Sequence, residues 1–222
     1  MGEYNLIIVA GGSGTRMGAD VPKQFLRIGG SPVLIHTLRI FQKTLPGVIP
    51  WLVLPESHHS FWNELYRESG TNLPHHLVAG GPTRFHSVKN GLQNISSGLV
   101  LVHDGVRPLV SKETILAVID KARQSGAAIP GIAVNESIRE KTGNTSRPVN
   151  RNNYLLVQTP QCFSYELMKA AFEQEYREEF TDCASVLEYC GTPVSLVEGN
   201  RENIKITLPA DLIFAEAYLK NH

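Results

Sequence analysis

The sequence predicts an α/β fold built on a mostly parallel, doubly wound sheet. Apolar runs of strand length alternate with segments of helical period along the chain. These runs are continuous rather than alternating with polar residues, which is typical of strands covered by helices on both faces. The 222 residues are enough to bury a substantial core in one unit. We therefore expect a single domain over residues 1–222.

Six segments are predicted to be strands, because each is a short apolar run bounded by turn-forming residues. They are Leu6–Ala10, Trp51–Pro55, His76–Gly80, Leu99–Asp104, Ala127–Val134 and Pro193–Gly199.

Five helices are expected between and after these strands. The helix over 31–45 is predicted to take Ser31 as its N-cap and Pro32 in its first turn. A later helix is predicted to begin at the cap Thr181 and to end at Gly191. The remaining predicted helices are 83–95, Ser111–Ser125 and Pro209–Leu219.

One segment interrupts the alternation of strands and helices. Glu136–Gln161 has strand-like ends around the turn-rich "TGNTSRP" and carries no helical stripe. We interpret it as a β-hairpin or arm, projecting at about 136–158. The apolar side of such an arm needs a partner, so we expect a homodimer formed through it.

Composition excludes several classes of protein. The chain has 21 basic residues (lysine and arginine) and 21 acidic residues (aspartate and glutamate). This charge balance argues against a general nucleic-acid or membrane-surface binder. The sequence shows neither an apolar run of membrane-spanning length nor a signal-peptide layout, so a cytoplasmic location is expected. The three cysteines, Cys162, Cys183 and Cys190, are predicted to be buried thiols in a reducing compartment.

The stretch "LIIVAGGSGTRMGADVPKQF" runs from an apolar strand into Gly11, Gly12 and Gly14. It lacks the third glycine of a dinucleotide fingerprint and the Gly-Lys-Ser/Thr of a Walker A loop. Glycines allow the backbone N–H groups to approach phosphate oxygens, and Arg16 and Lys23 supply two cations on the same loop. We interpret the loop as a polyphosphate site. The alternative is a tight turn with two solvated cations.

Two further clusters carry chemistry. In "VLVHDGVRP", Asp104 ends a strand at the edge where α/β sheets bind ligands, and one carboxylate with phosphate oxygens suits Mg²⁺. The alternative is that Asp104 caps the next turn and pairs with Arg107, while His103 packs in the strand. In "NIKIT", Lys205 is placed in a short strand before the last helix, where it faces either a cleft or solvent.

Seven motifs occur in order along nearly the whole chain: "AGGSGTRMG", "PKQF", "AGGPTRFHSV", "VHDGVRP", "NRNNYLLVQTPQ", "TDCASVLEYCG" and "VEGNRENIKIT". With these motifs the chain resembles the 2-C-methyl-D-erythritol 4-phosphate cytidylyltransferase family. The resemblance implies a Rossmann-like sheet with a protruding arm that forms a homodimer. It also implies transfer of a cytidylyl group from CTP to 2-C-methyl-D-erythritol 4-phosphate in non-mevalonate isoprenoid biosynthesis, with pyrophosphate as the second product.

The resemblance also implies residue roles. Arg16, Lys23, Arg151 and Lys205 are the expected catalytic groups, and Asp104 is the expected Mg²⁺ ligand. The expected CTP-binding residues are Ala10, Gly11, Gly12, Gly14, Gly81, Ser87, Asp104 and Gly105. The expected acceptor-binding residues are Arg107, Ser137, Arg151 and Thr159, with Arg151 reaching the neighbouring subunit's site.

The chain departs from the family pattern where the family often has Asp-Thr and this sequence has Glu136-Ser137. A sister family that transfers cytidylyl to ribitol 5-phosphate is therefore the alternative acceptor reading. Two other classes of protein fit the sequence less well. A nicotinamide oxidoreductase needs the missing glycine and a ribose-binding acid. A non-catalytic nucleotide-binding regulator has no need of Lys23, Asp104 and Lys205 together.

Overall fold

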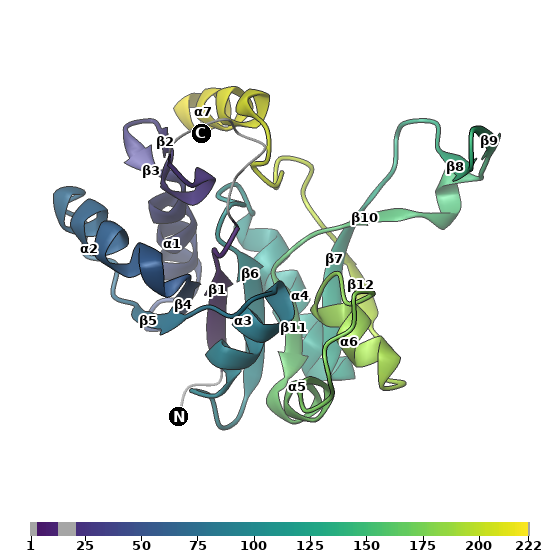
Figure 1. Ribbon diagram of the computed structural model, residues 1–222, viewed down its shortest axis with the longest axis horizontal. Coiled ribbons are helices and arrows are strands. Elements are labelled where there is room, and N and C mark those ends of the chain that lie inside the picture. Colours follow the sequence, from purple (N-terminus) through teal and green to yellow (C-terminus); the bar gives the residue numbers. More distant parts are fainter. Residues whose placement is uncertain (1–3, 13–20, 222) are drawn as a thin grey trace.

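The computed structural model describes residues 4–12 and 21–221. In it, one eight-stranded sheet runs through the molecule in the order β10-β7-β11-β6-β1-β4-β5, with β12 added beside β7 (Figure 1). The strands are β1 (Tyr4–Val9), β4 (Trp51–Leu54), β5 (His76–Ala79), β6 (Leu99–Asp104), β7 (Ala127–Ala133), β10 (Leu155–Val157), β11 (Gln161–Ser164) and β12 (Ser195–Glu198). Only β10 and β11 pair antiparallel in this sheet, so the predicted mostly parallel sheet is confirmed.

Seven α-helices lie within the described residues. They are α1 (Val33–Thr44), α2 (His59–Glu68), α3 (Arg84–Leu92), α4 (Lys112–Ser125), α5 (Tyr165–Phe172), α6 (Cys183–Tyr189) and α7 (Pro209–Asn221). Short 3₁₀ turns cover Lys23–Phe25, Glu56–His58 and Arg151–Asn153, and the small strands β2 (Arg27–Ile28) and β3 (Ser31–Pro32) pair with each other.

Strand β1 shows why the apolar runs are continuous. Leu6 and Ile8 face a core cluster that includes residues of α1, α2 and α4. Ile7 and Val9 point to the opposite face, into a cluster that includes residues of α3, α5 and α6. Because helices cover both faces, every one of these side chains is buried, and each large aliphatic one contributes roughly 2 kcal/mol.

Two predicted helix caps were wrong. Ser31 belongs to β3, and α1 begins after Pro32 because the backbone N–H of Val33 already donates to the carbonyl oxygen of Leu26 at 2.9 Å. When a backbone carbonyl accepts from a free N–H group of the first turn, that N–H needs no side-chain cap.

The second wrong cap concerns α6. It begins after Asp182, not after Thr181, because the Asp182 carboxylate accepts from the backbone N–H of Ser185 at 2.9 Å. The Ser185 hydroxyl faces back to the Asp182 N–H at 3.3 Å, which completes a capping box.

Several elements were not predicted. Helix α2 fully buries only Trp62, with Leu65 and Tyr66 packed partly buried against the core, and α5 has just eight residues. Strands β10 and β11 were assigned to the arm or to no element. Lys205 lies in irregular chain rather than in the predicted strand, because the bond from the Ile206 N–H to the Val106 carbonyl at 2.9 Å does not continue into a strand ladder.

The arm is present as a hairpin. Strands β8 (Arg139–Thr142) and β9 (Thr145–Pro148) pair antiparallel around a turn in which Gly143 has φ of 57°. Strand β10 then returns the chain to β7. Figure 1 shows the hairpin standing well away from the helices.

The cysteines agree with expectation in two of three positions. Cys162 and Cys183 are buried, whereas Cys190 is exposed because α6 ends there at the surface. Among the described residues, no helix is both long and apolar enough to cross a membrane.

Candidate active site

A pocket of about 290 Å³ lies at the carboxyl ends of the parallel strands. Its walls come from the turns after β1, β5 and β6 and from the extended chain before α7. The expected site residues among its lining are Ala10, Gly11, Gly12, Lys23, Gly81, Ser87, Asp104 and Lys205. Residues as far apart in sequence as Ala10 and Lys205 meet here because the carboxyl ends of parallel strands share one edge of the sheet.

Backbone hydrogen bonds between neighbouring strands fix where the chain leaves β1 and β6 at the edge of the pocket. The N–H of Ala10 donates to the Val53 carbonyl at 2.9 Å, and the N–H of Gly105 donates to the Val9 carbonyl at 2.8 Å. The chain therefore leaves β1 and β6 at the same level. This places Gly11 and Asp104 in the wall of one pocket.

Lys23 is held close to the glycine turn. Its residue is only 7% exposed, and it starts a 3₁₀ turn whose next residue, Gln24, donates its side-chain amide to the Ala10 carbonyl at 2.8 Å. A Cβ added at Gly12 would lie 3.6 Å from Lys23 Cε. The ammonium-bearing chain therefore lies beside the glycine turn rather than at the solvated surface.

Asp104 is the centre of a buried charge network. Its Oδ1 lies 3.3 Å from Arg84 Nε, and its Oδ2 lies 2.9 Å from Lys205 Nζ and 3.7 Å from Arg107 Nε. Burial raises the pKa of Asp104, but Arg84, Lys205 and Arg107 outweigh burial and hold the pKa well below its usual range. The carboxylate is therefore ionised at neutral pH. Asp104 lines the pocket and lies beside Arg107, as the alternative interpretation expected, while its role as a Mg²⁺ ligand stays a prediction.

Lys205 faces the pocket. Its side chain is 44% exposed, which leaves the ammonium room to exchange the Asp104 carboxylate for another anion. The choice between cleft and solvent, which the sequence left open, is thereby decided.

Arg84 was not predicted as a site residue. It is the first residue of α3, its Nη1 donates to Cys183 Sγ at 3.2 Å, and its Nη2 is buried without a hydrogen-bond partner among the described residues. The available signal was its place one residue after "GGPT", a turn that follows β5 at the ligand edge. The prediction failed because nothing local pairs Arg84 with a carboxylate twenty residues away.

Gly81 and Ser87 form one corner. The Gly81 N–H donates to Ser87 Oγ at 3.1 Å, and the Ser87 hydroxyl donates to the Thr83 carbonyl at 3.0 Å. A Cβ at Gly81 would lie 2.4 Å from His86 Cβ, so only glycine fits without a shift of α3. This corner keeps backbone polar groups and a hydroxyl at the pocket wall.

Thr159 and His103 support Asp104 from beneath. Thr159 Oγ1 accepts from the Asp104 N–H at 3.1 Å and lies 3.0 Å from His103 Nδ1, while His103 Nε2 lies 3.0 Å from the Arg107 carbonyl. These contacts are all satisfied if His103 is neutral with its proton on Nε2. Burial lowers the pKa of His103 to about 4, and the residue packs in the strand as predicted.

Arg107 and Gly105 contribute to the structure beneath the pocket. Arg107 Nη1 donates to the Asn203 carbonyl at 2.7 Å, which fastens the segment that carries Lys205. A Cβ at Gly105 would lie 2.9 Å from both Ala10 Cβ and Leu34 Cδ1, so this glycine allows close packing below the pocket.

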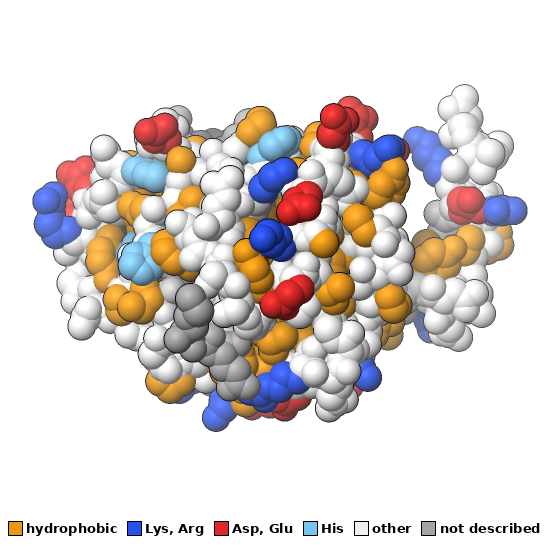
Figure 2. All heavy atoms as spheres, turned by 90° about the horizontal axis from the view of Figure 1, so that it is seen from below, with side chains coloured by type: hydrophobic (Ala, Val, Ile, Leu, Met, Phe, Trp, Pro, Cys, Tyr) orange, Lys and Arg blue, Asp and Glu red, His pale blue; other side chains and the backbone are white. Residues whose placement is uncertain are grey.

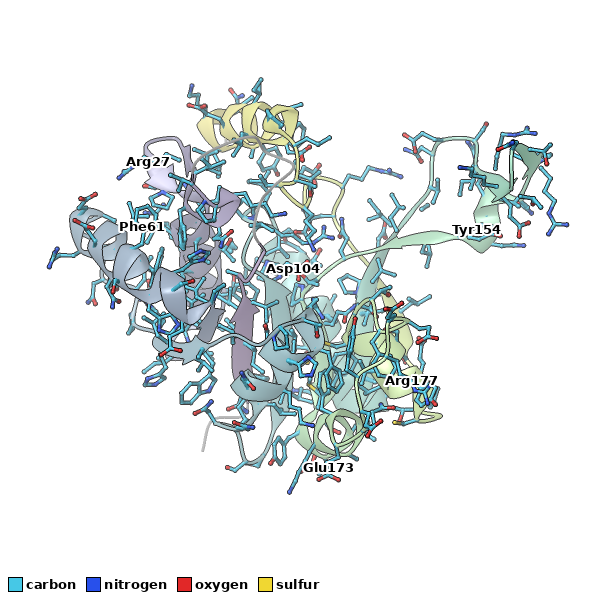
Figure 3. The ribbon with its side chains drawn as sticks, in the orientation of Figure 1. Arg27, Phe61, Asp104, Tyr154, Glu173 and Arg177 are labelled. Atoms are coloured by element: carbon cyan, nitrogen blue, oxygen red, sulfur yellow. The ribbon has the colours of Figure 1, made fainter. Side chains whose placement is uncertain are left out.

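The other expected site residues that the structure describes do not line this pocket. Arg151 and Ser137 are exposed, and the Arg151 guanidinium donates to the Asn135 carbonyl of its own chain. Figure 3 shows Tyr154, three residues after Arg151, far along the arm, while Asp104 lies in the body at the end of the sheet. Gly14 and Arg16 lie outside the described residues.

The oxygen, nitrogen and sulfur groups that line the pocket limit how it could bind a metal ion. Among the described lining residues, Asp104 is the one carboxylate, and no group of three or more potential ligands from His, Cys, Asp or Glu occurs in the described chain. An all-protein metal cage is therefore not formed by these residues. A single ionised carboxylate suits Mg²⁺ that takes its other ligands from phosphates and water, provided that Lys205 moves off Oδ2.

Comparison with known proteins gives a consistent result. The family model described as 2-C-methyl-D-erythritol 4-phosphate cytidylyltransferase matches residues 4–221. A protein of that name from Bacteroides fragilis is 53% identical over 214 residues, covering 96% of this chain and 98% of its own. One from Bacteroides thetaiotaomicron is 52% identical over 218 residues, covering 98% and 100%.

Solved structures agree. The crystal structure of 2-C-methyl-D-erythritol 4-phosphate cytidylyltransferase from Thermus thermophilus is 33% identical with a TM-score of 0.78, covering 97% of this chain and 98% of that one. The structure of 4-diphosphocytidyl-2C-methyl-D-erythritol synthase from Anaerococcus prevotii is 30% identical with a TM-score of 0.82, covering 98% and 96%.

Proposed function

We infer that this chain, which belongs to the 2-C-methyl-D-erythritol 4-phosphate cytidylyltransferase family, joins CTP and 2-C-methyl-D-erythritol 4-phosphate in isoprenoid biosynthesis. The products are 4-diphosphocytidyl-2-C-methyl-D-erythritol and pyrophosphate. The chain is thus a nucleotidyltransferase with a Rossmann-like α/β fold. The observation that carries the function is the family match over residues 4–221, together with a pocket that gathers its motifs. Ribitol 5-phosphate is the disfavoured acceptor.

We propose that CTP lies over the glycine turn after β1. Its phosphates take the N–H groups of Gly11 and Gly12 and the ammonium of Lys23. Gly14 and Arg16, which lie outside the described residues, are proposed to contact the phosphates as well. The Gly81–Ser87 corner offers backbone and hydroxyl groups of the kind that read a base edge. Asp104 lies within the same pocket and faces the ribose, with Gly105 beneath it.

The reaction needs charge neutralisation more than proton transfer. A phosphate oxygen of the acceptor attacks the α-phosphorus of CTP, and the bond to the β,γ-pyrophosphate breaks. The acceptor phosphate is already largely a dianion near neutral pH, so no general base is required. Lys23 and Arg16 would stabilise the charge that grows on the α-phosphoryl and leaving-group oxygens.

Lys205 is proposed to exchange partners during the cycle. Without substrate its ammonium pairs with Asp104 at 2.9 Å. When phosphates enter, Lys205 turns to them, while Arg84 and Arg107 remain beside the carboxylate and keep it ionised. Mg²⁺ or another divalent cation, held by Asp104 and the triphosphate, would supply further charge neutralisation.

The acceptor side is proposed to be completed by a second subunit. Arg107 and Thr159 belong to the body, whereas Ser137 and Arg151 lie on the arm, outside the pocket of their own chain. A homodimer that exchanges arms would bring the Arg151 fork to the acceptor phosphate of the neighbouring site. A cytoplasmic location, where thiols stay reduced, also remains a prediction.

The function is tested by a pyrophosphate-release assay with 2-C-methyl-D-erythritol 4-phosphate and ribitol 5-phosphate side by side, each with CTP, UTP and ATP. Turnover is expected with CTP and the methylerythritol phosphate. Equal or faster turnover of ribitol 5-phosphate would overturn the acceptor assignment, and equal turnover of UTP would overturn the cytosine reading of the Gly81–Ser87 corner.

A further inference from the structure

A second cavity, of about 650 Å³, lies between α1, the start of α4 and the end of α7. Among described residues it shares no lining residue with the nucleotide pocket. In Figure 1, α1 and α7 lie on the side of the body away from the arm, whereas α4 lies nearer the middle. None of the described lining residues belongs to the arm, so the cavity is separate from the surface proposed for dimerisation.

The cavity is rich in cations. Arg39 and Lys43 lie one turn apart on α1, Lys112 begins α4, and Lys220 lies near the end of α7. The described lining contains one acidic residue, Glu113. Within the described chain, Arg39, Lys43 and Lys112 have no ion-pair partner, and Lys220 pairs with Glu216 on its own helix at 3.2 Å. Since the whole chain has no net charge, this excess of positive charge is local.

Apolar side chains lie among the cations. Ile40 packs against the first core cluster, while Leu109, Tyr218 and Leu219 belong to or pack against the third, which joins α7 to the body. The wall at Leu109 is fixed, because its carbonyl oxygen accepts from the Asn200 side-chain amide at 3.0 Å. The cavity therefore offers apolar contact within reach of unpaired cations.

We propose that this cavity is a second ligand site, which takes a small anionic amphiphile: a phosphate or diphosphate group carried on a short apolar chain. Arg39, Lys43 and Lys112 bind the head group, since they line the cavity from two helices and have no ion-pair partner in the described chain. The apolar residues cover the chain. A bare anion leaves that apolar surface uncovered, and a neutral apolar compound leaves the cations unmatched.

The walls of the cavity continue into the nucleotide site. Leu109 lies two residues after Arg107, and Ile206, next to Lys205, donates its N–H to the Val106 carbonyl at 2.9 Å. For this reason the test variants are placed on α1, whose Arg39 and Lys43 line the second cavity and not the nucleotide pocket.

The experiment is a calorimetric titration of the full-length protein with hexyl phosphate, carried out with the nucleotide pocket saturated by CTP and no acceptor. The wild-type protein is expected to bind. The Arg39→Glu/Lys43→Glu variant should bind at least about tenfold more weakly, because two attractive charge contacts with the head group become repulsions. Arg67→Glu/Lys169→Glu, which reverses two exposed cations elsewhere, is the matched control and should bind as wild type does.

Three results would overturn the proposal. The first is that the wild-type protein does not bind hexyl phosphate. The second is that the α1 variant binds it equally well, which would place the probe at the acceptor side or at no specific site. The third is that hexanol or inorganic phosphate binds the wild-type protein as well as hexyl phosphate does. Cytidylyl transfer by each variant shows that it is folded. If the charge-reversed protein fails to fold, Arg39→Gln/Lys43→Gln takes its place with the same expected direction.

Discussion

The nucleotide pocket and the arm place charged side chains in opposite ways. In the pocket, Asp104 is buried and three cations from different segments converge on it. On the arm, the ion pair between Arg147 and Glu140 is exposed and crosses a single hairpin. The pocket's charges are thus positioned by the folded body of one chain, and the arm's charges are not.

The apolar surfaces differ in the same way. Strands β1 and β6 bury most of their side chains, whereas Tyr154, Leu155, Leu156 and Val157, in the segment that leads from the hairpin back to β7, are 42–53% exposed. Figure 2 shows the arm standing apart from the body with hydrophobic side chains at its surface. The described pocket residues are thus held in place by contacts within one chain, while the arm exposes apolar side chains that the proposed second copy would cover.

The largest effect is expected at Lys23. Lys23→Ala should lower kcat on the order of a hundredfold or more while weakening CTP binding much less, because the charge that it neutralises grows in the transition state. Steady-state pyrophosphate release measures this, with Lys169→Ala as the control for loss of an exposed lysine. Near wild-type turnover would show that the pocket's cation is not part of the machinery.

Arg151 tests whether the arm completes another subunit's site. Arg151→Ala should lose roughly a hundredfold in turnover, as for loss of one charged donor. When it is mixed with Lys23→Ala and the subunits exchange, activity should return, because the heterodimer then holds one site with both residues intact.

A cis role for Arg151 gives the opposite result, since each site of the heterodimer still lacks one residue. Absence of recovery, with subunit exchange shown independently by a tagged copy, contradicts the shared-site arrangement and makes the arm merely structural.

Asp104→Asn sharpens the account of the pocket. The change keeps shape and removes charge, so we expect turnover to fall on the order of tenfold or more and the Mg²⁺ concentration for half-maximal rate to rise. A Mg²⁺ titration measures both, with the exposed Asp120→Asn as control. An unchanged titration would mean that phosphates alone hold the metal.

His103 makes the body sensitive to acid. Its pKa is lowered by burial from about 6.5 to about 4, so protons favour the unfolded chain as pH falls through this window. Stability should drop by about 2 kcal/mol between pH 7 and pH 5 from this residue. The pKa of Asp104 is depressed, so its contribution is lost only below this window.

Urea unfolding at the two pH values measures the drop, and His103→Gln, which cannot titrate, should flatten it. An equally steep pH dependence in the variant would assign the effect to another group.

The smallest effect is expected on the arm. Glu140→Gln removes one partner of an exposed pair, so unfolding free energy should change by less than about 0.5 kcal/mol. Urea unfolding tests this beside Asp104→Asn. A large loss would show that the arm's charges are positioned as firmly as those of the pocket.

The sequence by itself determined the parallel strands of the body and the turns after them, though not the antiparallel β11. A continuous apolar run can only be satisfied by burial on both faces, and the polar residue that ends it, such as Asp104, marks where burial stops. Glycines after such runs permit the backbone conformations of the turn. Local chemistry was therefore enough to place Gly11 and Asp104 at one edge of the sheet.

The tertiary structure alone decided which charges meet. Arg84 and Lys205 are separated from Asp104 by 20 and 101 positions, and no local pattern encodes a contact across such distances. The start of α1 after Pro32 was decided in a similar way, because the Val33 N–H finds the Leu26 carbonyl only once β2 and β3 pair. The cap at Asp182 is different, since its partner Ser185 lies three residues away. The spacing of apolar residues and the local composition predict which segments are buried and where turns form. Which charged side chains pair depends on the path of the whole chain.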